Sequence, residues 1–216
     1  ITGTTGADGK ATAEITSTTA GTYTVTAKVN GKETEKDTTF VADGDSAHIA
    51  DADLSIDPDK SVANGAAKNG VTAIVTDSNG NVVPGASVAF TVSEGAEITT
   101  VIGTTGTDGK ATAEVTSLTA GTYTVTATVN GKETAKDTTF VADGTTAEIT
   151  DANLVIEPNN AVANGDAKNG AEATVTDANG NVVPGVEVNF SIAEGADIYV
   201  VQGTTDDNGK AFAEIT

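Results

Sequence analysis

The chain has 216 residues, of which 11 are basic and 31 acidic, and its formal net charge at pH 7 is −20. It contains one His and no Cys, Met or Trp, which excludes a disulfide scaffold, a thiolate metal site and a multi-histidine metal centre. A surface with this much negative charge repels phosphate backbones and anionic lipid head groups. We therefore expect no nucleic-acid binding and no direct membrane contact in this segment.

Short strands separated by turns are predicted along the chain. Apolar and polar residues alternate in 121–129, where Tyr123, Val125 and Val129 share one face, and the same period of two runs through 171–176 and 188–192. Asn-Gly, Asp-Gly and Pro-Gly pairs punctuate these runs and supply the positive φ that tight turns require. No helical stripe is visible. Seven strands are predicted in the middle of the chain, at 53–57, 70–77, 87–93, 97–101, 110–117, 121–129 and 133–141.

The chain repeats with a period of 100 residues. Residues 1–50 match 101–150 at 39 of 50 positions, and residues 51–116 match 151–216 at 40 of 66. A unit of about 100 residues with seven strands indicates an immunoglobulin-like β-sandwich. Residues 118–123 fit a tyrosine corner, in which the Tyr123 hydroxyl bonds to upstream backbone. We therefore predict an all-β chain of tandem immunoglobulin-like seven-stranded β-sandwich domains in a linear array.

Three units follow from this period. Residues 1–46 form the C-terminal part of one unit, 47–146 a complete unit, and 147–216 the N-terminal part of a third. Neither fragment can bury a two-sheet core alone, so the chain is expected to be a window from a longer array. The alternative is that adjacent copies complete one another head to tail and form a fibre. A concentration-independent monomer in solution would exclude the fibre.

Three segments carry a resemblance to a known family: VTDANGNVVPGVEVNFS (175–191), GTTDDNGKAFAEIT (203–216) and TAGTYTVTATVNG (119–131). In combination they resemble the group 1 bacterial immunoglobulin-like repeats of intimin and invasin adhesins. Such repeats form rods outside the cell, and similar ones occur in plasmid-encoded secreted proteins linked to conjugation. The resemblance implies an extracellular stalk at the bacterial cell surface, with neighbouring repeats of the same protein as partners.

Acidic residues near the two unit boundaries are candidate ligands for Ca²⁺, which prefers six to eight oxygen atoms. The candidates are Asp43, Asp45, Asp51, Asp53, Asp143 and Asp151. The alternative is a solvated acidic surface, in which case no cofactor is bound. The loops at 77–81 and 177–181 begin like calcium loops but lack the later bidentate Glu, so they are interpreted as turns between strands.

No catalytic constellation is predicted, and the chain is not expected to be an enzyme. The equivalent of His48 in the next unit is Glu148, so His48 is interpreted as a surface residue rather than a base. The favoured function is a structural stalk that positions a distal binding tip. The rivals are an adhesive module that contacts a receptor or glycan and a non-catalytic domain of a secreted carbohydrate-active enzyme. Tyr199 replaces Thr99 and is the one candidate for an exposed aromatic contact.

Overall fold

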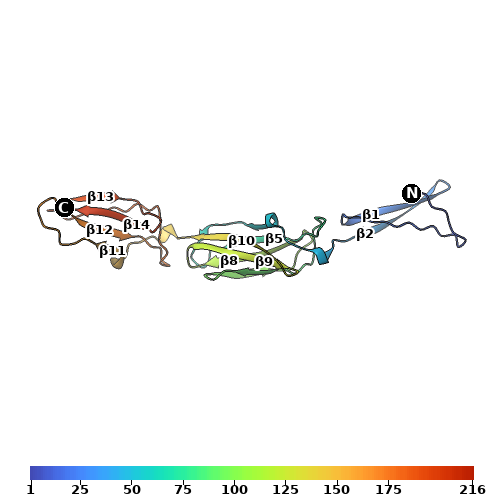
Figure 1. Cartoon of the computed structure of the whole chain (residues 1–216), viewed down its shortest axis with the longest axis horizontal. Coiled ribbons are helices and arrows are strands. Elements are labelled where there is room, and N and C mark those ends of the chain that lie inside the picture. Colours follow the sequence, from blue (N-terminus) through green and yellow to red (C-terminus); the bar gives the residue numbers. More distant parts are fainter.

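The computed structural model describes all residues from 1 to 216 and shows three bodies in a row (Figure 1). The first hairpin lies at one end, residues 147–216 lie at the other, and a larger two-layered body stands between them. The prediction of an all-β fold is confirmed, because the only helices are four 3₁₀ segments of three residues each. No helix combines the length and the hydropathy that crossing a bilayer requires.

The bounds of the elements follow in chain order. The strands are β1 (Gly21–Val29), β2 (Lys32–Phe40), β3 (Leu54–Ile56), β4 (Ser61–Val62), β5 (Asn69–Ile74), β6 (Ala89–Val92), β7 (Ala96–Ile102), β8 (Lys110–Ser117), β9 (Gly121–Val129), β10 (Lys132–Val141), β11 (Leu154–Ile156), β12 (Asn169–Thr174), β13 (Ile198–Gln202) and β14 (Lys210–Ile215). The 3₁₀ segments are η1 (Gly44–Ser46), η2 (Asp51–Asp53), η3 (Gly144–Thr146) and η4 (Asp151–Asn153).

The middle unit is a sandwich of two four-stranded sheets. One has the order β3-β5-β8-β7 and the other β4-β10-β9-β6. The sandwich is confirmed, but the prediction of seven strands is wrong by one. Strand β4 has two residues, too few for a visible periodicity, and pairs parallel with the end of β10 through Phe140↔Ser61 and Val141↔Val62. The chain therefore leaves the first sheet after Ile56 and joins the second at Ser61.

The predicted alternation along β9 is confirmed in the core of the middle unit. Tyr123, Val125, Ala127 and Val129 are each at most 8% exposed and face the opposite sheet. The threonines between them face outward, toward solvent, as a β-branched polar residue on a half-buried strand should. Seventeen buried residues make up this core, so aliphatic packing holds the two sheets together.

A buried amide also connects the two sheets. Asn69 on β5 is fully buried, and its Nδ2 lies 2.8 Å from both the Thr138 hydroxyl and the Thr139 carbonyl on β10. Its Oδ1 accepts a hydrogen bond from the Ser61 N–H at 3.0 Å. Because every buried side-chain polar atom in the structure has a partner, this polar contact adds specificity to the core without an unsatisfied group.

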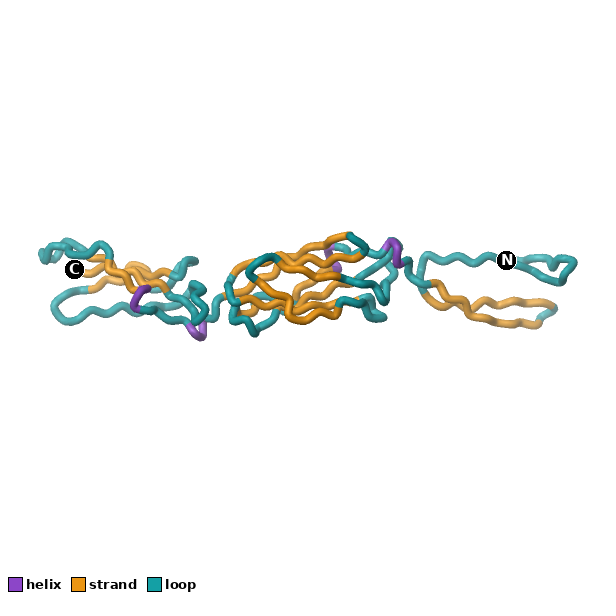
Figure 2. Tube along the Cα trace, turned by 90° about the horizontal axis from the view of Figure 1, so that it is seen from below, coloured by secondary structure: helices purple, strands orange, loops and turns teal.

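The two end units each lack part of this sandwich. Strands β1 and β2 form a hairpin with no second sheet, whereas β11-β12-β14-β13 form a single four-stranded sheet (Figure 2). The predicted strand at 188–192 does not form in the last unit, where Ile192 is 43% exposed. The hairpin sequence 21–41 differs from the core-filling 121–141 only at Lys28 and Glu35. Completion of one copy by another stays a prediction.

Candidate functional site at the joints between units

Three short segments meet at each boundary between units, and we call this meeting place the joint. The linker is 42–47 at the first joint and 142–147 at the second. The joint loop of the following unit is 77–81 or 177–181, and the corner of the preceding unit is 17–20 or 117–120. Each linker contains one of the 3₁₀ segments, which Figure 2 shows in purple at both boundaries.

At the second joint, the joint loop docks on the corner of the middle unit. The side-chain oxygen of Asn181 accepts a hydrogen bond from the Ala120 N–H at 2.8 Å, and its amide nitrogen donates to the Leu118 carbonyl at 3.1 Å. Both bonds cross the boundary between units, and Asn181 is only 9% exposed. One side-chain amide thus reproduces a donor–acceptor pair of a β-ladder.

The first joint has the same arrangement. Asn81 accepts from the Ala20 N–H at 2.8 Å and donates to the Thr18 carbonyl at 2.9 Å. This agreement holds although the first unit is only a hairpin, so the contact depends on the local corner and not on a complete sandwich. The joint is therefore a repeated structural feature with the 100-residue period of the sequence.

A buried carboxylate organises each joint loop. In the second joint, Asp177 Oδ1 accepts hydrogen bonds from the N–H groups of Asn179 and Asn181, both at 2.9 Å. Its Oδ2 accepts from the Asn181 amide at 2.9 Å and from the Asp143 N–H of the linker at 3.0 Å. Asp77 receives the corresponding four bonds, and both carboxylates are 2% exposed. One carboxylate therefore connects the linker, the loop and the docking amide.

These hydrogen bonds stabilise the ionised form of each aspartate. The amide of Asn81 is the main cause that lowers the pKa of Asp77, from 3.8 to about 2, against the opposing effect of burial. For Asp177, burial is the largest influence and would raise the pKa, but the Asn181 amide and three backbone N–H groups together lower it. Both carboxylates are charged at neutral pH without a cationic partner.

The joint should accordingly resist acid down to about pH 4. Because the pKa of Asp77 is lower in the folded joint than its ordinary value of 3.8, its contribution to stability is complete above that value. It is lost as the pH falls from 3.8 toward 2. Small-angle scattering from the chain between pH 7 and pH 2 should show an unchanged maximum dimension until about pH 4. Loss of the extended shape already at pH 5 to 6 would contradict this assignment.

The linker is fastened to the same joint loop. The Thr146 hydroxyl accepts a hydrogen bond from the Ala178 N–H at 3.2 Å, and Ser46 accepts from the Ser78 N–H at the same distance in the first joint. Ala142 and Ala147 pack against the core of the last unit. The linkers therefore belong to the following unit, which leaves little free chain between neighbouring bodies.

A further contact crosses the second joint away from the corner. The Asn179 amide donates to the Ala63 carbonyl at 3.1 Å. The Ala63 N–H in turn donates to the Val141 carbonyl, at the end of β10 where the linker begins. Ala63 is fully buried. The last unit thus contacts two separate parts of the middle unit, which opposes rotation about a single point.

Comparison with known proteins assigns the family of these units. The model of the bacterial Ig-like domain (group 1) matches residues 51–141 and 151–216. The chain belongs to this family. Over 219 aligned positions it is 32% identical to the inverse autotransporter adhesin YeeJ of Escherichia coli (strain K12). That alignment covers 98% of this chain and 9% of YeeJ, so the chain is an adhesin-related Ig-like region that spans a small part of its relative.

Solved structures support the same fold. Invasin, described as a bacterial integrin-binding protein, matches with a TM-score of 0.59 and 24% identity over 98% of this chain and 43% of its own. The Escherichia coli adhesin FdeC matches with a TM-score of 0.57 and 24% identity over 91% of this chain and 65% of its own. At these identities the comparison establishes the fold of consecutive Ig-like units and nothing about ligands.

The six candidate calcium ligands in this Ig-like chain do not converge. Asp43 and Asp143 accept hydrogen bonds at the start of η1 and η3, from the N–H groups of Asp45 and Thr145. Asp45 is exposed in η1, Asp51 and Asp53 lie in η2, and Asp151 begins η4. Nowhere in the structure do three His, Cys, Asp or Glu side chains gather so that they could hold a metal ion. The six aspartates instead lie in, or directly before, short 3₁₀ turns.

Calcium binding at the joints has a direct test. Because the carboxylates are dispersed, we expect the melting temperature of the chain to be the same in a calcium buffer and in excess chelator. Differential scanning calorimetry in the two buffers measures this. A rise of several degrees with calcium would place ligands at a joint after all.

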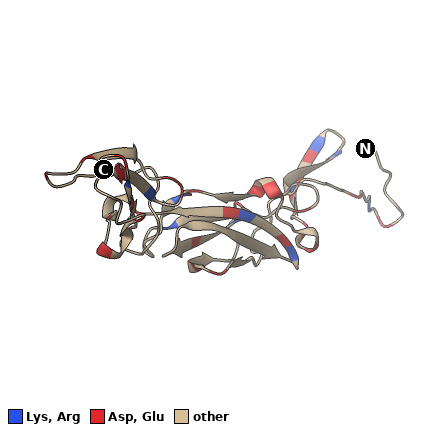
Figure 3. Cartoon of the chain, turned by 60° about the vertical axis from the view of Figure 1, so that its left-hand side comes forward, with Lys and Arg blue, Asp and Glu red and all other residues tan.

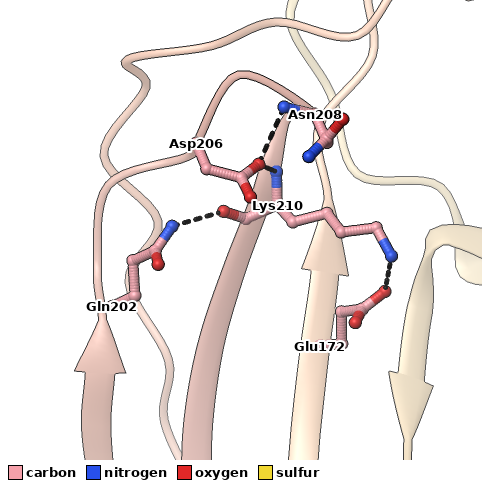
Figure 4. A network of polar contacts seen from close by, with 5 residues as sticks. All are labelled: Glu172, Gln202, Asp206, Asn208 and Lys210. Carbon is pink, nitrogen blue, oxygen red and sulfur yellow. Dashed lines mark hydrogen bonds and ion pairs between the residues drawn. The ribbon is translucent and has the colours of Figure 1, made fainter.

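Lys210 lies in a network of one ion pair and several hydrogen bonds at the start of β14. Its Nζ forms an ion pair with Glu172 at 2.6 Å, and its backbone N–H donates to Asp206 at 2.9 Å (Figure 4). Asp206 also accepts from the Asn208 N–H, and Gln202 donates to the Lys210 carbonyl. Residues 206–209 form the turn between β13 and β14, in which the Gly209 N–H donates to the Asp206 carbonyl.

Two sequence-based interpretations need correction or extension. His48 is half-buried rather than a plain surface residue, because it forms a β-bridge with Thr76 beside the joint loop. The 77–81 loop is a turn, as predicted, but its joint function was missed. The available signal was the recurrence of Asn81 as Asn181, since a turn that already ends in Gly does not require an asparagine at the next position.

Proposed function

We propose that this chain is a stiff, non-catalytic spacer of a bacterial extracellular adhesin, located at the cell surface, with neighbouring units as its partners. The observation that supports it is the repetition of the joint: the bonds that Asn81 makes to the preceding corner recur at Asn181 with lengths that agree within 0.2 Å. Docking bonds that recur in consecutive units support the same direction of each unit relative to its neighbour.

The geometry of one unit then sets the reach of the stalk. Strand β9 has nine residues, which at ~3.3 Å each correspond to roughly 30 Å. Because the units follow one another end to end (Figure 1), each one added to an array extends it by a fixed step. Charged residues are spread along the strands and loops of the row (Figure 3), and their acidic excess favours separation between neighbouring stalks.

Small-angle scattering of the chain tests the stalk. The proposal predicts a rod-like profile with one maximum dimension across a range of protein concentrations. The matched variant carries Asn81→Ala and Asn181→Ala, which remove both docking amides and should shorten the mean maximum dimension. A wild-type profile typical of flexibly linked bodies would contradict the proposal. A maximum dimension that grows with concentration would reveal head-to-tail association of copies.

An adhesive module is the competing function, and one residue favours it. Tyr199 on β13 is 71% exposed and stands where the middle unit has Thr99. Exposed aromatic residues are frequent centres of binding interfaces. A glycan array with this chain and with a Tyr199→Thr variant separates the two functions. The spacer predicts no binding by either protein, whereas binding by the wild type that the variant loses would favour the adhesive module.

A further inference from the structure

The tyrosine corner uses the backbone of a single residue inside its own unit. The Tyr123 hydroxyl donates to the Thr119 carbonyl at 2.8 Å, and the Thr119 N–H donates to the Ser117 hydroxyl at 3.0 Å. Ser117 is 4% exposed and also lies 2.8 Å from the Gly95 carbonyl, so the corner is held from within the sandwich. Both backbone polar groups of Thr119 are therefore committed to the middle unit.

The two backbone groups that flank Thr119 are the ones that the next unit binds. Leu118 and Thr119 form the bend between β8 and β9, and Tyr123 and Ser117 hold both backbone polar groups of Thr119 there. The Leu118 carbonyl and the Ala120 N–H lie on either side of these held groups. These are the two groups that contact Asn181.

The same relation appears at the first joint with different packing around it. Tyr23 is 39% exposed on a hairpin without a core, yet its hydroxyl donates to the Thr19 carbonyl at 2.9 Å. Thr18 and Ala20, on either side, bind Asn81. The corner thus keeps its docking groups in place even where burial of the tyrosine ring contributes little.

We propose that the tyrosine corner of each unit is the docking platform for the next unit, and that the Tyr123 hydroxyl is a positioning group for the second joint. This inference rests on the proposed stalk function and adds to it the residue that sets the orientation of the following unit. The hydroxyl acts through Thr119 and makes no contact with Asn181 itself. A unit with a disordered corner should therefore lose the orientation of its successor while its own sandwich persists.

The Tyr123→Phe variant tests the proposal. It removes the hydroxyl and retains the ring, which packs edge-to-face on Phe140 with centroids 6.1 Å apart. The Ala120 amide, which the joint protects, should exchange roughly three- to tenfold faster in the variant, as expected for the loss of one hydrogen bond. Tyr23→Phe is the matched control, and it should leave Ala120 exchange unchanged because it alters the other joint.

Orientation of the units gives the second readout. Spin labels on Thr91→Cys and Tyr199→Cys report the distance between the middle and last units in a chain with no native cysteine. Tyr123→Phe should broaden the distance distribution, as Asn181→Ala does. If Asn181→Ala broadens it and Tyr123→Phe changes neither readout, the platform is refuted and the stalk stands. A broad distribution in the wild type would refute the stalk instead.

A folding control keeps the test decisive. If Tyr123→Phe abolishes the thermal transition of the middle unit, Ser117→Ala replaces it, because that variant removes the other group holding Thr119 and leaves the tyrosine intact. Ser117→Ala should also accelerate Ala120 exchange and broaden the distance distribution. Unchanged values in a folded Ser117→Ala protein would overturn the proposal.

Discussion

Leu54→Ala should destabilise the middle unit by about 2–5 kcal/mol, the range measured for truncation of a fully buried leucine. Leu54 on β3 is completely buried in the seventeen-residue core, and its loss leaves a cavity between two sheets that cannot close over it. For a domain of this size, such a change lowers the melting temperature by about 10 °C or more. Differential scanning calorimetry of the whole chain measures the shift.

The repeat supplies a matched control for that substitution. Leu154 occupies the same place in the last unit but is 50% exposed, because residues 147–216 form one sheet with no second sheet over it. Leu154→Ala should therefore cost roughly 1 kcal/mol or less. Equal effects of the two substitutions would contradict the assignment of the core to the middle unit.

Asp177→Asn should open the second joint while the sandwich of the middle unit stays intact. The carboxylate accepts four hydrogen bonds, and an asparagine in its place would direct an N–H₂ group toward N–H donors on one side. The Asp143 and Asn181 N–H groups, which the carboxylate protects, should then exchange roughly tenfold faster or more, because buried donors would lose their acceptor.

Asp166→Asn is the control for the change in charge. Asp166 lies in the same unit, is exposed, and its side chain makes no contact with the joint, yet its substitution alters the net charge equally. Exchange at Asp143 and Asn181 should remain as in the wild type. If both variants accelerated exchange to the same degree, general electrostatics rather than the local hydrogen bonds would explain the effect.

Much of the fold was predictable because it depends on local patterns. Alternation along residues 121–129 placed Tyr123 and Val125 inside the sandwich, and the spacing around Tyr123 predicted its corner. The two residues of β4 were not predictable, since a pair has no periodicity and its pairing with β10 is a long-range contact. Asn69 was missed for a related reason: a polar residue beside glycine suggests a turn, and only the folded sheets bring Thr138 to it.

The joint shows a different limit of sequence reasoning. Asp77 and Asn81 satisfied the chemistry of a turn, so the pattern had a sufficient explanation before their contacts with the preceding unit were known. The boundary aspartates suggested a metal because they cluster in sequence, but in the folded chain no three of them gather so that they could hold an ion. A high density of acidic residues in the sequence does not determine whether their carboxylates come together in the folded chain.

The distance between Thr91→Cys and Tyr199→Cys spin labels, measured by pulsed electron spin resonance in the intact chain, tests the stiff joint most directly. A fixed joint predicts one narrow distribution that broadens in Asn181→Ala and stays narrow in Asn81→Ala, whose substitution affects only the first joint. A broad wild-type distribution, or one indifferent to Asn181→Ala, would show that consecutive units move independently and would contradict the stalk.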